Sequence, residues 1–506
     1  MTFEIVFVLL SLLGMVAALI ADKMRPGMIL FSVVVLFLCA GILTPKEMLE
    51  GFSNKGMITV ALLFLVSEGI RQSGTLGQVI KKLLPQGKTT VFKAQLRILP
   101  SVAFISAFLN NTPVVVIFAP IIKHWAKSVN LPATKFLIPL SYVTILGGIC
   151  TLIGTSTNLV VHGMILEAGF EGFSMFELGK VGIFIAIAGI IYIFLFSKRL
   201  LPDARPDTAV PDEEVEEGEK LHRVEAVLGA RFPGINKKLK DFNFQRHYGA
   251  EVKEIKTRNG QRFVSNLEEV VLHEGDTLVV MADDTFIPTW GESSVFVLLT
   301  NGNEPDTTGK KKRWFALLLL VLMIVGATVG ELPITKEMFP DIKLDMFFFV
   351  SITTIIMAWT NLFPARKYTK YISWDILITI ACAFAISKAM VNSGVADSVA
   401  KFIIGLSDDY GPHVLLAMVF IITNLFTELI TNNAAAALAF PLALSISAQL
   451  GVSPTPFFVV ICMAASASFS TPIGYQTNLI VQGIGNYKFT DFVRIGLPLN
   501  IITFLI

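Results

Sequence analysis

Four short polar clusters interrupt long apolar stretches of this sequence, two in each half of the chain. They occupy residues 110–113 and 154–158 in the first half and residues 431–433 and 470–478 in the second. Asn and Thr favour the position just before a helix, and Pro favours the first helical position, so the clusters predict breaks followed by fresh helix starts. A helix N-terminus offers free N–H groups and a partial positive charge. Two such termini could therefore hold one anion without any Lys or Arg.

The same clusters supply unwound carbonyl groups and the side-chain oxygens of Asn, Ser and Thr. A hard cation prefers oxygen ligands, so we expect a Na⁺ site beside the anion site. The alternative is that these polar residues only hold helices together, as Ser, Thr and Asn often do in membranes. The occurrence of four clusters at corresponding positions favours the first interpretation.

The two halves of the chain match each other at an offset of about 320 residues, which indicates an internal repeat. The matched pairs are Asn111 with Pro120 and Asn432 with Pro441, then Gly154 with Asn158 and Gly474 with Asn478. Counting apolar spans from the basic loops gives the two copies opposite orientations. Inverted repeats with interrupted helices are typical of secondary transporters.

The composition indicates a membrane protein, because 53% of the 506 residues are hydrophobic and only 16% are charged. Spans of roughly 20 apolar residues are predicted at 2–20, 27–44, 56–70, 137–164, 180–198, 314–330, 344–361, 373–390, 456–483 and 491–506. Two further apolar stretches, 98–122 and 413–446, are broken in the middle. They predict re-entrant hairpins whose tips are buried in protein. The net charge of +2 gives no case for nucleic-acid binding.

We therefore expect an all-α polytopic membrane protein with two inverted repeats, re-entrant hairpins and broken helices, plus a small α+β insert. The predicted domains are a first membrane repeat at 1–200, an insert at 203–309 and a second membrane repeat at 313–506. Basic residues are richer in the loops on the side of the insert. This bias predicts an N-terminus outside and a cytoplasmic insert, in the inner membrane of a bacterium.

The insert begins with an acidic stretch, Asp212 to Glu217, which predicts a solvated spacer. Short β-rich runs follow at 221–228, 250–256, 262–272 and 277–281, with turn signals such as Asn259-Gly260 between them. Tyr248-Gly249, Val252, Ile255, Gly260 and the run from Leu272 to Val280 resemble the TrkA-C (RCK C-terminal) domain family. That resemblance implies a regulatory module that binds a small-molecule regulator or dimerises.

Glu428 lies inside the second predicted hairpin, four residues before Asn432. An acidic residue within the membrane is a candidate for ion coupling, but it can also be a buried structural partner of hydrogen-bond donors. The sequence leaves both interpretations open.

The hairpin clusters resemble the divalent anion:sodium symporter (DASS) family, whose hairpin tips carry a Ser-Asn-Thr signature. Here the tips read Asn110-Asn111-Thr112 and Thr431-Asn432-Asn433, so the central asparagines match. The resemblance implies that these six residues bind the substrate anion. It also implies a first Na⁺ site of Ser106, Asn110, Asn111 and Gly154, and a second of Thr427, Ile430, Asn432 and Gly474.

The same resemblance implies a homodimer in membrane lipid that moves its substrate by an elevator motion, with Na⁺ as coupling ion and no prosthetic group. Asn110 and Asn433 stand where the family has hydroxyls, and we expect a sulfate-type anion rather than a dicarboxylate. The rival hypotheses are a Na⁺/H⁺ antiporter or arsenite-type efflux permease, and a ligand-gated ion channel. An enzyme is not expected, because HExxH, GxSxG and Walker A patterns do not occur in the sequence.

Overall fold

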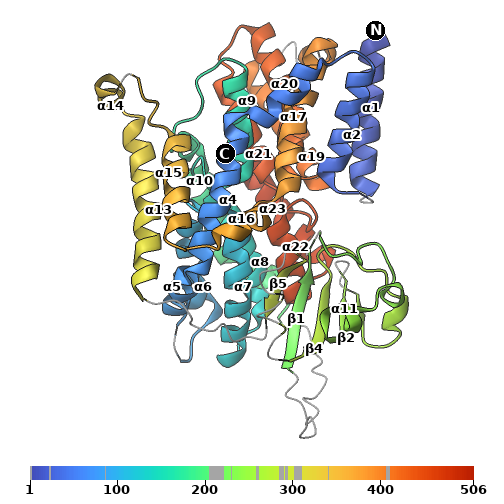
Figure 1. Cartoon of the computed structure of the whole chain (residues 1–506), viewed down its shortest axis with the longest axis vertical. Helices are drawn as coiled ribbons and strands as arrows, with labels where there is room; N and C mark the ends of the chain where they lie inside the picture. The colour runs from blue at the N-terminus through green and yellow to red at the C-terminus, as the bar shows by residue number, and fades with distance from the viewer. Residues whose placement is uncertain are drawn as a thin grey trace, which may run out of the picture.

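The computed structural model describes residues 3–21, 24–85, 87–203, 222–229, 231–257, 261–283, 286, 290, 295–300, 310–339, 341–405 and 411–506. Seven helices in these ranges are long and apolar enough to cross a membrane. They are Phe3–Ala21, Pro45–Gln72, Gly179–Leu200, Lys311–Gly330, Trp374–Asn392, Pro412–Leu429 and Asn432–Leu450. The predicted polytopic all-α membrane protein with a small α+β insert is confirmed (Figure 1).

The regular elements of the membrane part before the insert, as far as the structure describes it, are helices joined by short loops. Its helices are α1 (Phe3–Ala21), α2 (Pro26–Cys39), α3 (Pro45–Glu50), α4 (Lys55–Gln72), α5 (Thr75–Leu83), α6 (Val91–Ser106), α7 (Asn111–Ser128), α8 (Leu137–Gly148), α9 (Ser156–Glu167) and α10 (Gly179–Leu200). The hairpin predicted at 98–122 is the pair α6 and α7. The span predicted at 137–164 is broken into α8 and α9, as its polar cluster indicates.

The membrane part after the insert repeats this plan. Its helices are α13 (Lys310–Gly330), α14 (Pro333–Met338), α15 (Met346–Trp359), α16 (Tyr368–Tyr371), α17 (Trp374–Asn392), α18 (Val395–Gly405), α19 (Pro412–Leu429), α20 (Asn432–Leu450), α21 (Thr455–Ser466), α22 (Gln476–Gly485) and α23 (Phe489–Leu505). Here α19 and α20 form the second hairpin, and α21 and α22 form the second broken span.

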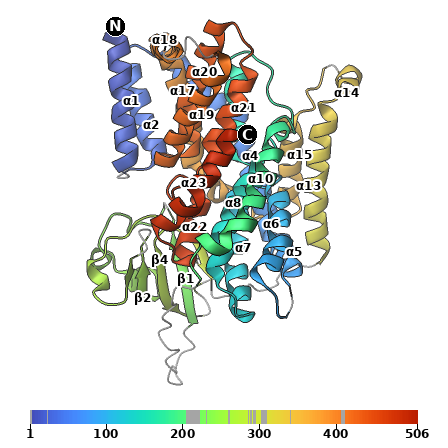
Figure 2. The same cartoon turned by 180° about the vertical axis from the view of Figure 1, so that it is seen from behind.

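The two hairpins lie at opposite ends of the membrane part. Figures 1 and 2 show α6 and α7 in the lower half of the molecule and α19 and α20 in the upper half. Each tip contacts the broken span of the other repeat: the side chain of Thr112 contacts that of Gln476, and the side chain of Ser156 contacts that of Asn433. This arrangement supports the inverted repeat that the sequence predicts.

The insert contains a five-stranded antiparallel sheet in the order β3-β2-β4-β1-β5. The strands are β1 (His222–Leu228), β2 (Glu251–Lys256), β3 (Arg262–Phe263), β4 (Thr277–Ala282) and β5 (Phe296–Thr300), and α11 (Phe244–Tyr248) precedes β2. Because strand side chains alternate between faces, Val224, Ala226 and Leu228 enter the insert's own apolar core. Val227 points the other way and joins the core of the membrane part.

Two expectations for the insert were wrong in detail. The run 262–272 is not a continuous strand, because Asn266 adopts a left-handed backbone and a short 3₁₀-helix follows at Leu267–Glu269. The strand Phe296–Thr300 was not predicted. The acidic stretch Asp212 to Glu217 and the turn Asn259-Gly260 lie outside the described residues.

Candidate functional site

Four helices begin at the point where the two repeats meet. They are α7 at Asn111, α9 at Ser156, α20 at Asn432 and α22 at Gln476. Each hairpin tip contacts the broken span of the other repeat. The Thr112 hydroxyl lies 3.3 Å from Gln476 Oε1, and the Asn433 amide oxygen accepts from Ser156 at 3.3 Å and from Thr157 at 3.2 Å. The site therefore concentrates the free N–H groups of four helix N-termini, which favours an anion.

A cluster of oxygen atoms lies beside the tip of the first hairpin. The side chains of Ser106 and Asn111 are buried, and Ser106 Oγ lies 2.8 Å from the terminal amide atom of Asn111. The carbonyl oxygens of Thr144 and Gly154 lie 3.1 and 3.2 Å from that same amide atom. When this atom is Oδ1, four oxygens converge on one small space. Such a set of neutral oxygens fits a Na⁺ ion.

The second hairpin tip has the corresponding arrangement. Thr427 Oγ1 lies 3.0 Å from Asn432 Oδ1 and 2.6 Å from the carbonyl oxygen of Ala465 in the last turn of α21. Gly474 packs so tightly that an added Cβ would lie 2.4 Å from the Thr427 carbonyl oxygen. The predicted pair of oxygen clusters, one in each repeat, is thus assembled around Ser106 with Asn111 and around Thr427 with Asn432.

The broken spans are held open by the same hydrogen bonds in both repeats. Asn158 Nδ2 donates to the carbonyls of Gly148 and Thr151 at 3.3 and 2.8 Å. Asn478 Nδ2 donates to the carbonyls of Ser468 and Thr471 at 2.9 and 3.2 Å. Each asparagine satisfies carbonyls that the helix break leaves without an amide partner, which explains why both breaks end in Asn.

Tyr475 is the residue that sequence reasoning missed. Its hydroxyl lies 2.6 Å from the Asn111 amide and 2.9 Å from Thr155 Oγ1, and it also interacts with the Asn432 side chain. This buried phenol therefore joins the two hairpin tips to the first broken span. A signal was available, since Tyr475 stands at the repeat position of Thr155 within the second polar cluster.

The surroundings of three further predicted ligands differ from one to the next. Asn110 lines a small cavity with Ser156, Val60 and Leu320, so it faces α4 and α13 rather than the Ser106 oxygens. The Ile430 amide donates to the Phe426 carbonyl at 2.8 Å, and its side chain packs in an apolar cluster. Thr431 Oγ1 is buried at the site and has no hydrogen-bond partner in the part of the chain that the structure describes.

Glu428 lies just outside the second hairpin tip. Its Oε1 accepts from the Ser470 amide at 2.8 Å and from Asn500 Nδ2 at 2.7 Å, and its Oε2 lies 3.4 Å from Ser468 Oγ. The carboxylate thus holds one end of the second broken span against α23. Of the two interpretations left open by the sequence, these contacts support a structural partner of hydrogen-bond donors.

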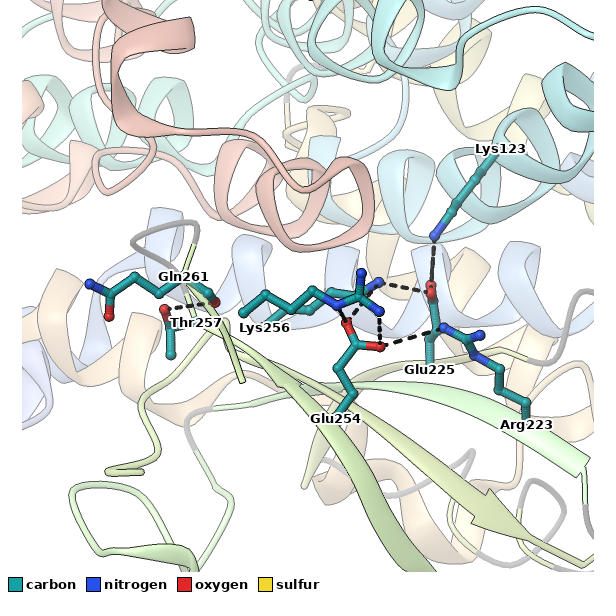
Figure 3. Close-up of polar contacts among 8 residues, drawn as sticks. Lys123, Arg223, Glu225, Glu254, Lys256, Thr257 and Gln261 are labelled. Carbon is teal, nitrogen blue, oxygen red and sulfur yellow. Dashed lines mark hydrogen bonds and ion pairs between the residues drawn. The ribbon is translucent and has the colours of Figure 1, made fainter. Parts of the chain in front are cut away.

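The insert docks on α7 through a network of charged side chains (Figure 3). Lys123 Nζ lies 3.0 Å from both carboxylate oxygens of Glu225, and Lys256 Nζ lies 3.4 Å from one of them. Arg262 Nε is 2.5 Å from the buried carboxylate of Glu254. Burial raises the pKa of the Glu225 carboxyl, but the charges of Lys123 and Lys256 outweigh this effect and hold that pKa at about 2.

The same sheet face also meets α22. A Cβ added to Gly483 would lie 2.5 Å from Thr277 Oγ1, and one added to Gly275 would lie 3.5 Å from the Leu479 side chain. The insert therefore contacts two helices, α7 and α22, that both begin at the candidate anion site.

A polytopic helical fold with two opposed hairpins, two broken spans and an uncharged site of helix N-termini defines a membrane transporter. The family model described as citrate transporter (CitMHS) matches residues 16–448 and 343–506, and the chain belongs to this family. An uncharacterized transporter of Synechocystis is 30% identical over 93% of this chain and 90% of its own length. The uncharacterized transporter YfbS of Escherichia coli is 26% identical over 99% of this chain and 97% of its own length.

A sodium/sulfate cotransporter of Chlamydomonas reinhardtii is 31% identical over 55% of this chain and 31% of its own length. Together these relatives confirm that the protein is a transporter of the divalent anion:sodium symporter type and not an enzyme.

Proposed function

We propose that the protein is a Na⁺-coupled symporter of a small divalent anion, with sulfate preferred over dicarboxylates. The observation that carries this proposal is the pairing of two neutral oxygen clusters with four helix N-termini at one point. Neutral oxygens suit Na⁺, and helix N-termini suit an oxyanion without a fixed basic residue. The cotransporter name of the Chlamydomonas relative supports the same pair of substrates.

In this proposal the first Na⁺ binds among Ser106, Asn111 and Gly154, and the second among Thr427, Asn432 and Gly474. The carbonyls of Thr144 and Ala465 are added to these sets, because the first lies beside the Asn111 amide and the second beside the Thr427 hydroxyl. The anion binds between Asn111 with Thr112 and Thr431 with Asn432 and Asn433, and Tyr475 lies between the two tips. The unpartnered Thr431 hydroxyl is available to donate to this anion.

The burial of Tyr475 between the two hairpin tips supports a small substrate. The Tyr475 ring is buried and its hydroxyl already spans from one hairpin tip to the other. A tetrahedral oxyanion needs less room than a four-carbon dicarboxylate, whose two carboxylates must both be accommodated.

The remaining parts of the proposal concern the whole assembly. We place the membrane repeats at 1–200 and 313–506, with a cytoplasmic TrkA-C-like domain at 203–309 that binds a small-molecule regulator. The N-terminus is outside, in a bacterial inner membrane, and the protein acts as a homodimer. Each hairpin-bearing domain moves against a fixed scaffold as an elevator, so a cross-link that locks the two together should abolish transport.

The test is uptake of labelled sulfate and labelled succinate into proteoliposomes, with and without an inward Na⁺ gradient. Na⁺-driven uptake of sulfate in excess of succinate is the expected result. Uptake of succinate in excess of sulfate would reject the substrate, and no Na⁺-driven uptake of either anion by folded protein would reject the symporter.

A further inference from the structure

The Asn111 amide can take two orientations in the same space, and they differ in which neighbours it pairs with. In one, Oδ1 faces Ser106 Oγ at 2.8 Å while Nδ2 donates to the Tyr475 hydroxyl at 2.6 Å. Turned by half a revolution, Nδ2 donates to Ser106 Oγ and to the carbonyls of Thr144 and Gly154, and Oδ1 accepts from the Tyr475 hydroxyl. The heavy atoms lie in the same places in both cases. Only the direction of the hydrogen bonds differs.

A bound cation stabilises one of these two orientations over the other. With Nδ2 turned inward, an amide donor points at Ser106, Thr144 and Gly154, and Na⁺ would meet a positive partial charge. With Oδ1 turned inward, the same three oxygens and Oδ1 all present lone pairs. Na⁺ therefore stabilises the second arrangement and its removal stabilises the first, because three acceptors without a donor repel one another.

The orientation of Asn111 affects the anion site because it decides where the proton of the Tyr475 hydroxyl points. A phenol has one O–H group and can accept through its lone pairs. When Oδ1 of Asn111 faces Tyr475, the phenol must donate its proton to Asn111. When Nδ2 faces Tyr475, the phenol accepts from Asn111, and its proton is free for Thr155 or for an anion between the two tips.

We propose that Asn111 and Tyr475 form a hydrogen-bond relay. Na⁺ bound at the first hairpin tip turns the Asn111 amide, and this frees the Tyr475 hydroxyl to donate its proton to the anion. This inference rests on the proposed symport and specifies how one Na⁺ promotes anion binding. Without Na⁺, Tyr475 presents lone pairs to the site and disfavours an oxyanion. With Na⁺, Tyr475 presents a proton and favours it. By thermodynamic linkage the anion must strengthen Na⁺ binding by the same factor.

The test measures binding on purified protein, so it does not depend on transport. The midpoint of thermal unfolding is recorded with Na⁺ alone, sulfate alone and both, with choline replacing Na⁺ at constant ionic strength. From these midpoints the factor by which Na⁺ raises sulfate affinity is obtained. For Tyr475→Phe, we expect Na⁺ alone to stabilise as in the wild type, while the linkage factor falls at least tenfold. Tyr192→Phe is the matched control, since its buried hydroxyl donates to the Ile495 carbonyl at 3.0 Å away from the site.

A second variant keeps the inference falsifiable if Tyr475→Phe does not fold. Asn111→Asp replaces the amide nitrogen by an oxygen, so the Tyr475 proton is always accepted. It should lose the ability of Na⁺ to promote sulfate binding, which is read as the ratio of the sulfate affinities with and without Na⁺. A wild-type linkage factor in either variant would overturn the relay while leaving the symport intact. A wild-type protein that shows no Na⁺-dependent sulfate binding and no uptake would instead reject the proposed function itself.

Discussion

The contact between the insert and α7 makes a quantitative prediction. The perturbation is Glu225→Gln, which keeps the shape of the side chain and removes the charge that faces Lys123 and Lys256. The side chains of Glu225 and Lys123 are 15% and 24% exposed, and that of Lys256 is 3% exposed. The pair is therefore neither fully buried nor a surface pair.

These exposures set the expected magnitude. Removing one partner of a fully buried ion pair costs about 3–5 kcal/mol, whereas an exposed pair is worth about 0–1 kcal/mol. For this partly exposed network we expect the docked state to lose about 2 kcal/mol relative to the undocked state. That change corresponds to a roughly 30-fold larger undocked fraction, since about 1.4 kcal/mol is a factor of ten.

The assay uses the buried face of the sheet as a reporter. Thr277 is fully buried and faces Gly483 on α22, so a cysteine at this position reacts only when the insert leaves the membrane part. Thr277→Cys is placed in a chain whose four native cysteines are replaced by alanine, and the rate of thiol labelling is measured. Glu225→Gln should raise that rate roughly 30-fold, as the docking free energy implies.

Two further variants decide whether the charge is responsible. Glu251→Gln is a matched control in the same insert, because the Glu251 side chain is 54% exposed and pairs only across the surface with Lys253. It should leave the labelling rate unchanged. Lys123→Met removes the partner on α7 and leaves Glu225 with Lys256, so it should also raise the labelling rate. An unchanged rate in Glu225→Gln, or a rise of the same size in Glu251→Gln, would refute the reasoning.

Ser106→Ala and Thr427→Ala each remove one oxygen beside a central asparagine. Each should weaken Na⁺ binding several-fold, as the loss of about 1 kcal/mol implies. The Na⁺ dependence of sulfate uptake measures this weakening, and an unchanged dependence in both variants would contradict the two cation sites. Glu428→Gln should keep Na⁺-driven sulfate uptake and lower the unfolding midpoint, because it removes a charge-assisted acceptor; complete loss of uptake with an unchanged midpoint would restore the coupling role. The folded pKa of Glu225, about 2, lies below its ordinary value of 4.5, so its stabilisation of docking is complete above pH 4.5 and disappears as the pH falls toward 2. Labelling of Thr277→Cys with a pyridyl disulfide should accelerate across this window in the parent chain and not in Glu225→Gln.

The sequence predicted the membrane architecture well because its signals are local. An apolar stretch that is broken by Asn and Pro, as at 110–113, predicts a hairpin, and α7 begins at Asn111 in the structure. The offset between the halves also placed Asn111 against Asn432 and Gly154 against Gly474, since each repeat must break its helices at the same step. The insert was predicted less well, because its short strands carry weaker patterns. β5 in particular pairs with β1, which is distant in sequence, so no local pattern indicates it.

The pairing of side chains across the site was decided only in three dimensions. Sequence offsets relate each residue to its repeat partner, but the contacts cross between repeats, so Asn111 meets Tyr475 and Asn433 meets Ser156. Glu428 finds its donors within its own repeat, but they come from the following broken span and from α23, which are distant in sequence. The ion pair between Glu225 and Lys123 likewise joins residues that are distant in sequence, and no pattern around either residue predicts the contact. Local patterns determine where helices begin and end, whereas the donors and acceptors that a buried polar group meets depend on how distant helices pack around it.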